Sequence, residues 1–532
     1  MKNNPFNFRI SSSPTRPKRH NRDKAQQEFD VADLVNDGPF GQPLVGDETE
    51  QQSPPDEKLR QAYFWIVNYA VISPYYDIEY NTHTPQPFTF GDSRAELRLP
   101  TDQSYSSFIL LPLLTFATQR KCLFIGGPGR GKTASALLMG LLAGDDSKTV
   151  RRNTLHGHPQ MTVADLLGNP LPKDLMQAED EADIRISWRS WLKQRVKIID
   201  EYNRIPTRTQ SALLSVLGDN YAEMFNQIYE CPSAAWYLTA NDDQGGGTYP
   251  VIEALKDRID VVVQALPFNP RFLDELLMRV EQNIDPTDFF PEDLHFSVAE
   301  MEQMQAEIKA IKLPGTLRRR LEYFVSQFEF SEFSGDTFEY QSKDTSRLAG
   351  VPRHFLAQLE SGRDRLADLG CQTTNGLSVR SLMSLIIYAK ALAYFRGNSA
   401  VSLEDITQII PFVLHSHLHQ DPDAPLFADA DYKTFLSDKV GWLRYLFKES
   451  NLAFDLQGLN NHDPIAELKA QLDQGLEQVS ERECRSQLQK IEQLLTSFSQ
   501  SNKLTGVIHS DALTLKYMHQ RYSNYLRWLQ SR

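Results

Sequence analysis

The sequence predicts an α/β domain built on a parallel sheet, followed by a mostly helical region. From Lys121 onward, short apolar segments alternate with segments of helical spacing, which is the pattern of α/β folds. From about residue 270 to 420 the apolar residues recur at helical intervals instead, most clearly over 382–395 and 403–418. We therefore expect a sheet-containing domain first and a helical domain after it.

Length and composition limit the number of domains and the class of protein. The 532 residues suffice for about two to four domains, and 41% hydrophobic with 23% charged residues is typical of a globular protein. The net charge of −13 disfavours a general nucleic-acid coat, because an acidic chain repels phosphate backbones. The longest apolar run, 108–117, is too short for a membrane span, and residues 1–13 lack the apolar core of a secretory signal. The scattered cysteines favour reduced thiols in a cytoplasmic protein.

Composition and periodicity divide the chain into four parts. Residues 1–60, rich in Pro, Ser, Asn and mixed charges, are expected to be a disordered tail, and 61–268 to hold an aromatic-rich lead-in and the α/β domain. The helical region covers 269–420. Within it, apolar alternation at period two on both sides of a turn predicts a β-hairpin near 327–345. Residues 421–532 are expected to form a helical extension containing an antiparallel helical hairpin.

The expected strands are 122–126, 196–200, 236–240 and 259–264. A glycine-rich segment begins at the end of the first strand and leads into a helix: Gly126, Gly127, Pro128, Gly129, Arg130, Gly131, Lys132 and Thr133. This is the GxxxxGK[ST] phosphate loop in its required context, where backbone N–H groups and a helix N-terminus converge on an anion. We expect Lys132 to reach the β- and γ-phosphates of ATP and the Thr133 hydroxyl to bind Mg²⁺. A chance glycine turn is the alternative.

Two further strands lead into polar residues. The strand 196–200 ends in Asp200 and is followed by Glu201. Beside a phosphate loop, Asp200 is expected to assist in binding Mg²⁺ and Glu201 to activate water as a base. Asn241, which follows the strand 236–240, would position the attacking water. An ordinary turn after a strand is the structural alternative in both places.

These segments resemble the MoxR group of AAA+ ATPases. DEYNRIP at 200–206 with QSALL at 210–214 resembles that group's DEINRxPxxxQSALL, and GTYP at 247–250, followed by Glu253-Ala254 and Asp257-Arg258, resembles GTYPLPEAxLDRF. GLSVRS at 376–381 is similar to the GASPRA motif at the start of the lid helix. The resemblance spans about 105–420. One departure is LTAND at 238–242, where the group usually has ATQNP.

The resemblance implies an AAA+ P-loop NTPase fold with a helical lid, and Mg²⁺-dependent ATP hydrolysis. Residue by residue, it gives Asn241 the sensor-1 role, Arg380 the sensor-2 role at the γ-phosphate, and Arg258 the role of an arginine finger acting on the neighbouring subunit. Surface ion pairs are the structural alternative for both arginines. At the level of the whole protein it implies a chaperone-like motor, a hexameric ring and a client with a von Willebrand A domain.

Two other functions remain open. A nucleic-acid-directed AAA+ motor would need a basic pore, yet the phosphate-loop side offers only Arg130, Arg151 and Arg152 close in sequence. An ATP-switched scaffold with negligible turnover would be expected to lose some of the hydrolytic residues. The run HSHLH at 415–419 suggests a metal site, but side chains two apart on a helix point to different faces, which makes convergence on one ion unfavourable.

Overall fold

The computed structural model describes residues 53–72, 74–91, 96–177, 184–241, 249, 251–334, 337–348, 366–500 and 503–531. Most of the expected disordered tail, 1–60, lies outside these residues. Helix α2 (Pro55–Trp65) nevertheless begins inside it, so the expectation of disorder is wrong for 55–60. Pro55 occupies the first helical position, where its missing N–H costs nothing, and Leu59 is fully buried.

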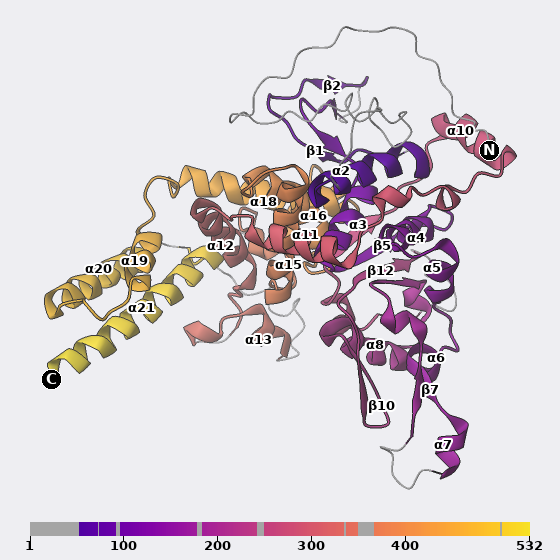
Figure 1. Cartoon of the computed structure of the whole chain (residues 1–532). Helices are drawn as coiled ribbons and strands as arrows, with labels where there is room; N and C mark the ends of the chain where they lie inside the picture. The colour runs from indigo at the N-terminus through magenta and orange to yellow at the C-terminus, as the bar shows by residue number, and fades with distance from the viewer. Residues whose placement is uncertain are drawn as a thin grey trace, which may run out of the picture. The chain divides into compact units, whose positions relative to one another are not determined.

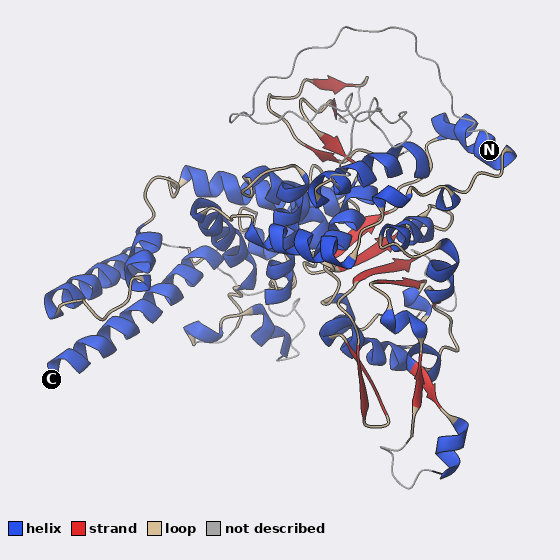
Figure 2. Cartoon of the chain, viewed as in Figure 1, coloured by secondary structure: helices blue, strands red, loops and turns tan. Residues whose placement is uncertain are grey.

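The central feature is a sheet of five parallel strands in the order β13-β5-β12-β9-β6 (Figures 1 and 2). Its strands are β5 (Lys121–Ile125), β6 (Leu155–His156), β9 (Val196–Asp200), β12 (Ala235–Ala240) and β13 (Val261–Gln264). The four predicted strands are therefore confirmed to within one or two residues. β5 lies between β13 and β12, so its carboxyl end is inside the sheet, at the end of the strands where α/β proteins bind ligands.

Alternate strand residues face two separate hydrophobic cores. Phe124 and Tyr237 belong to one core, whereas Leu123 and Leu238 belong to the other. This is the burial expected of parallel strands covered by helices on both faces. The helices of this part are α3 (Ser107–Thr118), α4 (Lys132–Leu142), α5 (Ser147–Asn153), α6 (Val163–Leu167), α7 (Pro172–Gln177), α8 (Thr207–Asp219) and α9 (Glu253–Lys256), with the short turns η1 (Ile66–Ala70), η3 (Ser190–Lys193) and η4 (Tyr202–Arg204).

In the described residues, four two-stranded antiparallel pairs accompany the main sheet. They are β1 (Ile78–Glu79) with β4 (Ser104–Tyr105), β2 (Pro87–Thr89) with β3 (Glu96–Arg98), β7 (Gly168–Pro170) with β8 (Ile186–Trp188), and β10 (Tyr221–Met224) with β11 (Gln227–Glu230). The β10–β11 turn places Phe225 and Asn226 at φ 50° and 54°. A two-residue turn with both φ values positive favours Asn-Gly, so a Phe-Asn pair gives little signal in the sequence.

The region after β13 is helical, as predicted. Its helices are α10 (Leu273–Glu281), α11 (Val298–Ala310), α12 (Gly315–Glu329), α13 (Lys343–Leu348), α15 (Val379–Phe395), α16 (Leu403–Val413), α17 (Pro425–Ala428) and α18 (Lys439–Leu456), with the turns η5 (Pro270–Phe272), η6 (Pro286–Asp288), η7 (Glu292–Leu294), η8 (Phe338–Tyr340), η9 (Leu369–Gln372) and η10 (Lys433–Leu436). Ser378 caps α15 by accepting a hydrogen bond from the Ser381 N–H, so the GLSVRS segment does begin a helix.

The β-hairpin predicted near 327–345 is wrong. Helix α12 continues to Glu329, and among the described residues of this segment the strand-like pairing is a single antiparallel bridge between Phe330 and Ser342. Leu321, Phe324 and Phe328 are buried at helical spacing on α12. Phe330 is also buried because the chain leaves the helix there, which produces the period-two alternation without a strand.

The extension contains α19 (Pro464–Asp473), α20 (Glu481–Ser499) and α21 (Gly506–Gln530), which share a core that includes Leu468, Cys484, Ile491 and Met518. The sequence predicts the antiparallel hairpin over 468–495, but the structure forms it from α20 and α21, since Glu492 contacts His519 and Glu481 contacts Gln530. Of the helices that the structure describes, none has the length and apolar composition of a membrane span.

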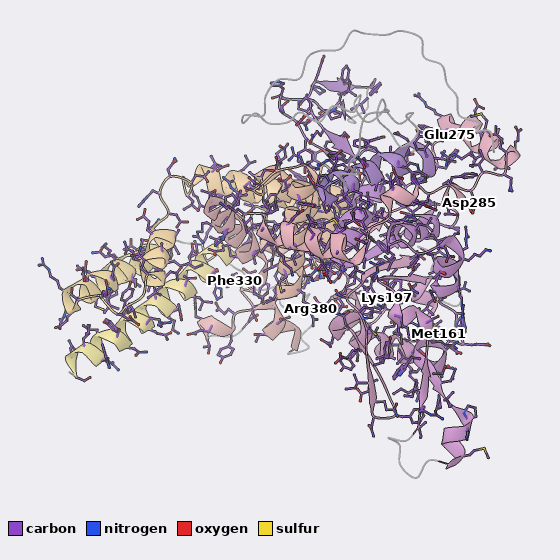
Figure 3. All side chains as sticks on the ribbon, in the orientation of Figure 1. Met161, Lys197, Glu275, Asp285, Phe330 and Arg380 are labelled. Atoms are coloured by element: carbon purple, nitrogen blue, oxygen red, sulfur yellow. The ribbon has the colours of Figure 1, made fainter. Side chains whose placement is uncertain are left out.

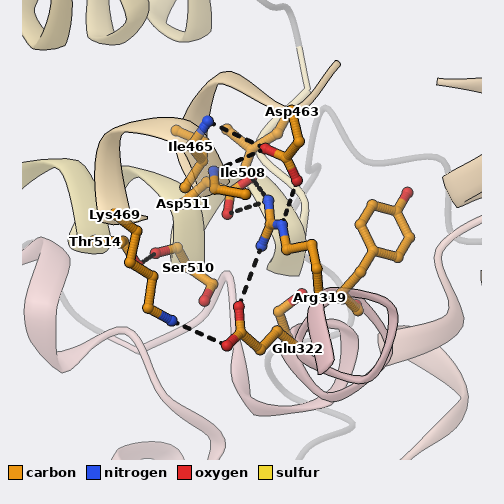
Figure 4. A network of polar contacts seen from close by, with 12 residues as sticks. Arg319, Glu322, Asp463, Ile465, Lys469, Ile508, Ser510, Asp511 and Thr514 are labelled. Atoms are coloured by element: carbon orange, nitrogen blue, oxygen red, sulfur yellow. Dashed lines mark hydrogen bonds and ion pairs between the residues drawn. The ribbon is translucent and has the colours of Figure 1, made fainter. Parts of the chain in front are cut away.

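Arg319 of α12 joins the extension to the preceding helices (Figure 4). Its guanidinium donates to the carboxylates of Asp463, the N-cap of α19, and Asp511 of α21, the latter at 3.2 Å. Burial raises the pKa of Asp511, and the charge of Arg319 opposes that rise. One side chain therefore compensates two buried carboxylates from separate helices.

We expect Arg319→Ala to lower the free energy of unfolding by about 3–5 kcal/mol, the cost of leaving buried charges without their partner. Chemical denaturation followed by circular dichroism measures this difference. Arg318→Ala, which removes an exposed arginine from the same turn, is the matched control and should be nearly neutral. Equal stability of the two variants would contradict the anchoring role of Arg319.

Candidate nucleotide-binding site

The predicted phosphate loop lies between β5 and α4, at the carboxyl edge of the sheet. Gly129 and Gly131 have φ of 72° and 77°, in the left-handed region that favours glycine. Gly126 has φ 142°, and a Cβ there would lie 2.7 Å from the Ala265 carbonyl oxygen. The glycines are therefore required by the backbone path that forms the anion cradle.

Lys132 is the first residue of α4 and is almost completely buried. Its Nζ donates to the carbonyls of Gly126 and Gly127 at 2.6 and 2.7 Å, and to Asn241 Oδ1 at 2.8 Å. The ammonium group is thereby held over the loop, next to the N-terminus of a helix. Arg130 turns away from this position, since its Nη1 donates to the Ala265 carbonyl at 2.9 Å.

Asp200 gathers the oxygen atoms expected around a magnesium ion. The Thr133 hydroxyl donates to Asp200 Oδ1 at 2.8 Å, Thr239 donates to the same oxygen, and His156 Nδ1 lies 3.4 Å from Oδ2. Hydroxyl and carboxylate oxygens are hard ligands that fit Mg²⁺. In the described ranges no cluster of three His, Cys, Asp or Glu residues could hold a metal. Mg²⁺ in nucleotide sites usually has only one or two protein ligands and takes the others from substrate phosphates and water.

Glu201 adopts a left-handed conformation, with φ 53°. Its N–H donates to Thr239 Oγ1 at 2.9 Å, and its two carboxylate oxygens accept hydrogen bonds from Asn241 Nδ2 at 3.0 Å and Arg204 Nη1 at 2.9 Å. Asn241 therefore bridges Lys132 and Glu201. The structure brings together these residues, which the sequence predicted from three separate strands.

Gly157 supports this arrangement and was not assigned to the site from the sequence. A Cβ at Gly157 would lie 2.3 Å from the Glu201 carbonyl oxygen, and the Gly157 N–H donates to the Asp200 carbonyl at 2.8 Å. Thr239 was also missed, although strand alternation gives a signal, because residues two apart lie on the same face as Asn241. Of the GTYP segment, Gly247, Thr248 and Pro250 lie outside the described residues.

Arg258 and Arg380 lie away from the residues that surround the phosphate loop. Arg258 precedes β13; its Nη1 donates to the Ala254 carbonyl at 2.9 Å, and its buried Nε has no hydrogen-bond partner among the described residues. Arg380 projects from the start of α15 (Figure 3), and its Nη1 donates to Asp257 Oδ2 at 3.0 Å. The Arg380 side chain is 55% exposed. A surface ion pair, the structural alternative for both arginines, is formed by Arg380 with Asp257.

Asp257 connects the start of β13 to the helical region. Ser378 Oγ donates to Asp257 Oδ1 at 2.8 Å, and His417 Nδ1 lies 3.7 Å from the same oxygen. The nearby His417 imidazole, together with the hydrogen bonds from Ser378 and Arg380, holds the pKa of Asp257 well below its usual range. Asp257 is therefore ionised at neutral pH and holds Arg380 beside the segment before β13, which also carries Arg258.

The two arginines and the phosphate loop belong to opposite edges of the sheet. β13 is parallel to β5 and pairs from Val261 with Cys122 to Gln264 with Ile125, so Arg258 precedes the amino ends while the loop follows the carboxyl end. Burial lowers the pKa of Lys121, the first residue of β5, and the charges of Arg380 and Arg258 lower it further. A five-residue strand spans about 15 Å, so both arginines are separated from the phosphate loop of the same chain by about the length of a strand.

We expect Gly157→Ala to destabilise the fold by about 1–3 kcal/mol, because the added methyl group must displace the Glu201 turn. ATP turnover should fall with it. Thermal unfolding and phosphate release measure the two effects. Gly315→Ala is the control, since its Cβ would meet no atom within 4 Å. Wild-type turnover in Gly157→Ala would show that the turn does not depend on this glycine.

Known proteins resemble this chain in sequence and structure. Residues 370–432 match the family model of the AAA lid domain. Over 300 residues the chain is 23% identical to Chaperone MoxR1 of Mycobacterium tuberculosis, which covers 56% of this chain and 67% of that protein. A crystal structure from Cytophaga hutchinsonii, described as a proposed ATPase, covers 62% of this chain and 88% of its own at 18% identity and a TM-score of 0.42. With the strand order and the phosphate loop, the first two matches identify the chain as a MoxR-like AAA+ ATPase.

Proposed function

We propose that this protein hydrolyses ATP, with Mg²⁺ as cofactor, in a homo-oligomeric ring and uses hydrolysis to remodel a partner protein. The observation that carries the proposal is the division of the site between two edges of one sheet. Lys132, Glu201 and Asn241 meet at the carboxyl edge, whereas Arg258 and Arg380 lie at the amino edge. A head-to-tail contact between copies would bring the two halves together, and such heterologous contacts either close into a ring or continue as an open filament.

The residues at the carboxyl edge would bind the nucleotide and orient the attacking water. Lys132 and the N-terminus of α4 would hold the phosphates, and Thr133 and Asp200 would hold Mg²⁺, which supplies positive charge to the phosphate oxygens. Glu201 Oε1 would accept a proton from the attacking water, while the Asn241 amide keeps that oxygen in position.

The residues at the amino edge would act on the next subunit. Arg258 and Arg380 would stabilise the charge that develops during phosphoryl transfer, an effect worth about 10³- to 10⁵-fold in rate for arginine fingers of GTPases. Because Asp257 ties Arg380 to the start of β13, both arginines would approach the neighbouring nucleotide as one unit.

The finer features of the proposal rest on the family. Similarity to a protein named a chaperone supports a remodelling activity. The resemblance to the MoxR group supports a hexamer, a client with a von Willebrand A domain and a cytoplasmic location. The acidic net charge of −13 is consistent with a protein client rather than a nucleic acid.

We expect Glu201→Gln to retain ATP binding and to lose at least about 100-fold in hydrolysis, the usual contribution of a general base. Binding of a fluorescent ATP analogue and phosphate release test the two parts separately. Glu230→Gln, an exposed change on β11, serves as the control. Unchanged turnover in Glu201→Gln would remove Glu201 as the base.

Mixing two inactive variants tests the shared site. Glu201→Gln subunits keep Arg258, and Arg258→Ala subunits keep Glu201, so a mixed ring contains complete sites. In a random equimolar mixture about one quarter of head-to-tail contacts are complete, and we expect up to about a quarter of wild-type activity to return.

The same experiment with Arg380→Ala in place of Arg258→Ala asks whether Arg380 acts across the contact. Recovery of activity in that mixture is the expected result. Recovery with Arg258→Ala but none with Arg380→Ala would assign Arg380 to its own subunit. Arg318→Ala, mixed in the same ratio with Glu201→Gln, shows the effect of dilution alone.

A further inference from the structure

Helix α10 has an apolar face that the described part of the chain leaves exposed. Leu273, Leu277 and Val280 are 47%, 48% and 69% exposed, and no residue of this nine-residue helix is buried. With Leu276 they form an i, i+3, i+4, i+7 stripe, which is the pattern of a helix that packs one face against a partner. Exposed apolar stripes of this kind in otherwise folded proteins mark interaction sites.

Apart from Met278, the remaining residues of α10 are charged, and one of them joins the helix to the end of η1. Arg279 Nη1 donates to the Ala70 carbonyl at 3.0 Å, and its Nη2 donates to Glu275 Oε1. Figure 3 labels Glu275 on this helix and Asp285 in the segment that follows it. These contacts hold α10 through its polar side and leave the apolar stripe uncovered by them.

The segment before α10 is connected to the phosphate-loop side of the sheet, whereas the segment after it packs beside the C-terminal end of α4, toward the amino ends of the strands. The segment before it starts at Ala265, whose carbonyl accepts the hydrogen bond from Arg130 of the loop and contacts Gly126. The segment after it returns to α5, where Arg151 Nη2 donates to Asp285 and Thr287. Between Ala265 and α10, Leu266 and Phe268 are exposed as well. The apolar surface therefore begins directly beside the nucleotide site.

We propose that the apolar stripe of α10 (Leu273, Leu276, Leu277 and Val280) is covered by the second copy of this chain that delivers Arg258 and Arg380 to the phosphate loop. The inference rests on the proposed shared site. A neighbour that brings its amino edge to this phosphate loop must approach the side from which α10 extends. The site is incomplete without that neighbour, which favours a second copy over a client as the occupant.

The test introduces charge into the stripe. Leu277→Glu with Val280→Glu should leave the melting temperature and the binding of a fluorescent ATP analogue unchanged, because neither side chain is buried in the subunit. The protein concentration at half-maximal specific ATPase activity, and at half-assembly by light scattering, should rise at least tenfold. Leu456→Glu, which charges another highly exposed leucine at the end of α18, should shift neither.

Equal assembly of the double variant and the wild type would overturn the proposal. If Glu201→Gln and Arg258→Ala subunits with an unchanged α10 still recover activity when they are mixed, the shared site stands and only the assignment of this surface is wrong. A monomeric wild type with concentration-independent turnover would overturn both.

Hydrogen exchange of the α10 amides identifies the occupant. Slowing on assembly is expected. Slow exchange already in the dilute monomer would show that the same chain covers the stripe. Equally fast exchange in monomer and ring would show that the neighbouring copy does not cover it, and would favour a client protein as the occupant. Either of these results would overturn the proposal.

Discussion

The parallel alignment of β5, β9 and β12 is the constraint on which the candidate site depends. Because the three strands run in one direction, their carboxyl ends meet, and polar residues that are distant in sequence lie within hydrogen-bond distance. Asn241 shows the result, since one amide contacts both the Lys132 ammonium and the Glu201 carboxylate. The left-handed turn at Glu201 is possible in this space because Gly157, on the adjoining strand end, has no side chain.

The same alignment places the amino ends of the strands at the other edge, and the helical region attaches there. Asp257 accepts hydrogen bonds from Ser378 and Arg380, so a change in the position of α15 moves the segment before β13 with it. Arg258 belongs to that segment. The phosphate loop and this joint between the sheet and the helical region are thus separated by about the length of a strand.

Polar contacts also determine how the C-terminal extension is attached to α12. Its three helices have a core of their own, and Arg319 compensates Asp463 and Asp511 from two of them (Figure 4). Buried ionic contacts add little net stability compared with apolar packing, but they fix the geometry of the groups that they join. The arrangement defines how α19 and α21 sit on α12.

Local sequence determined the phosphate loop, the strands that flank it and the acidic pair, because glycine spacing, apolar runs and strand ends are short-range signals. The same kind of signal misled at 327–345, where Phe328 and Phe330 alternate like a strand although α12 ends between them. Only the tertiary structure decided that Arg380 pairs with Asp257, since that contact joins residues 123 positions apart through the docking of α15. It also decided that the stripe on α10 stays exposed, because burial depends on what the rest of the chain brings to a helix and not on the spacing of its leucines.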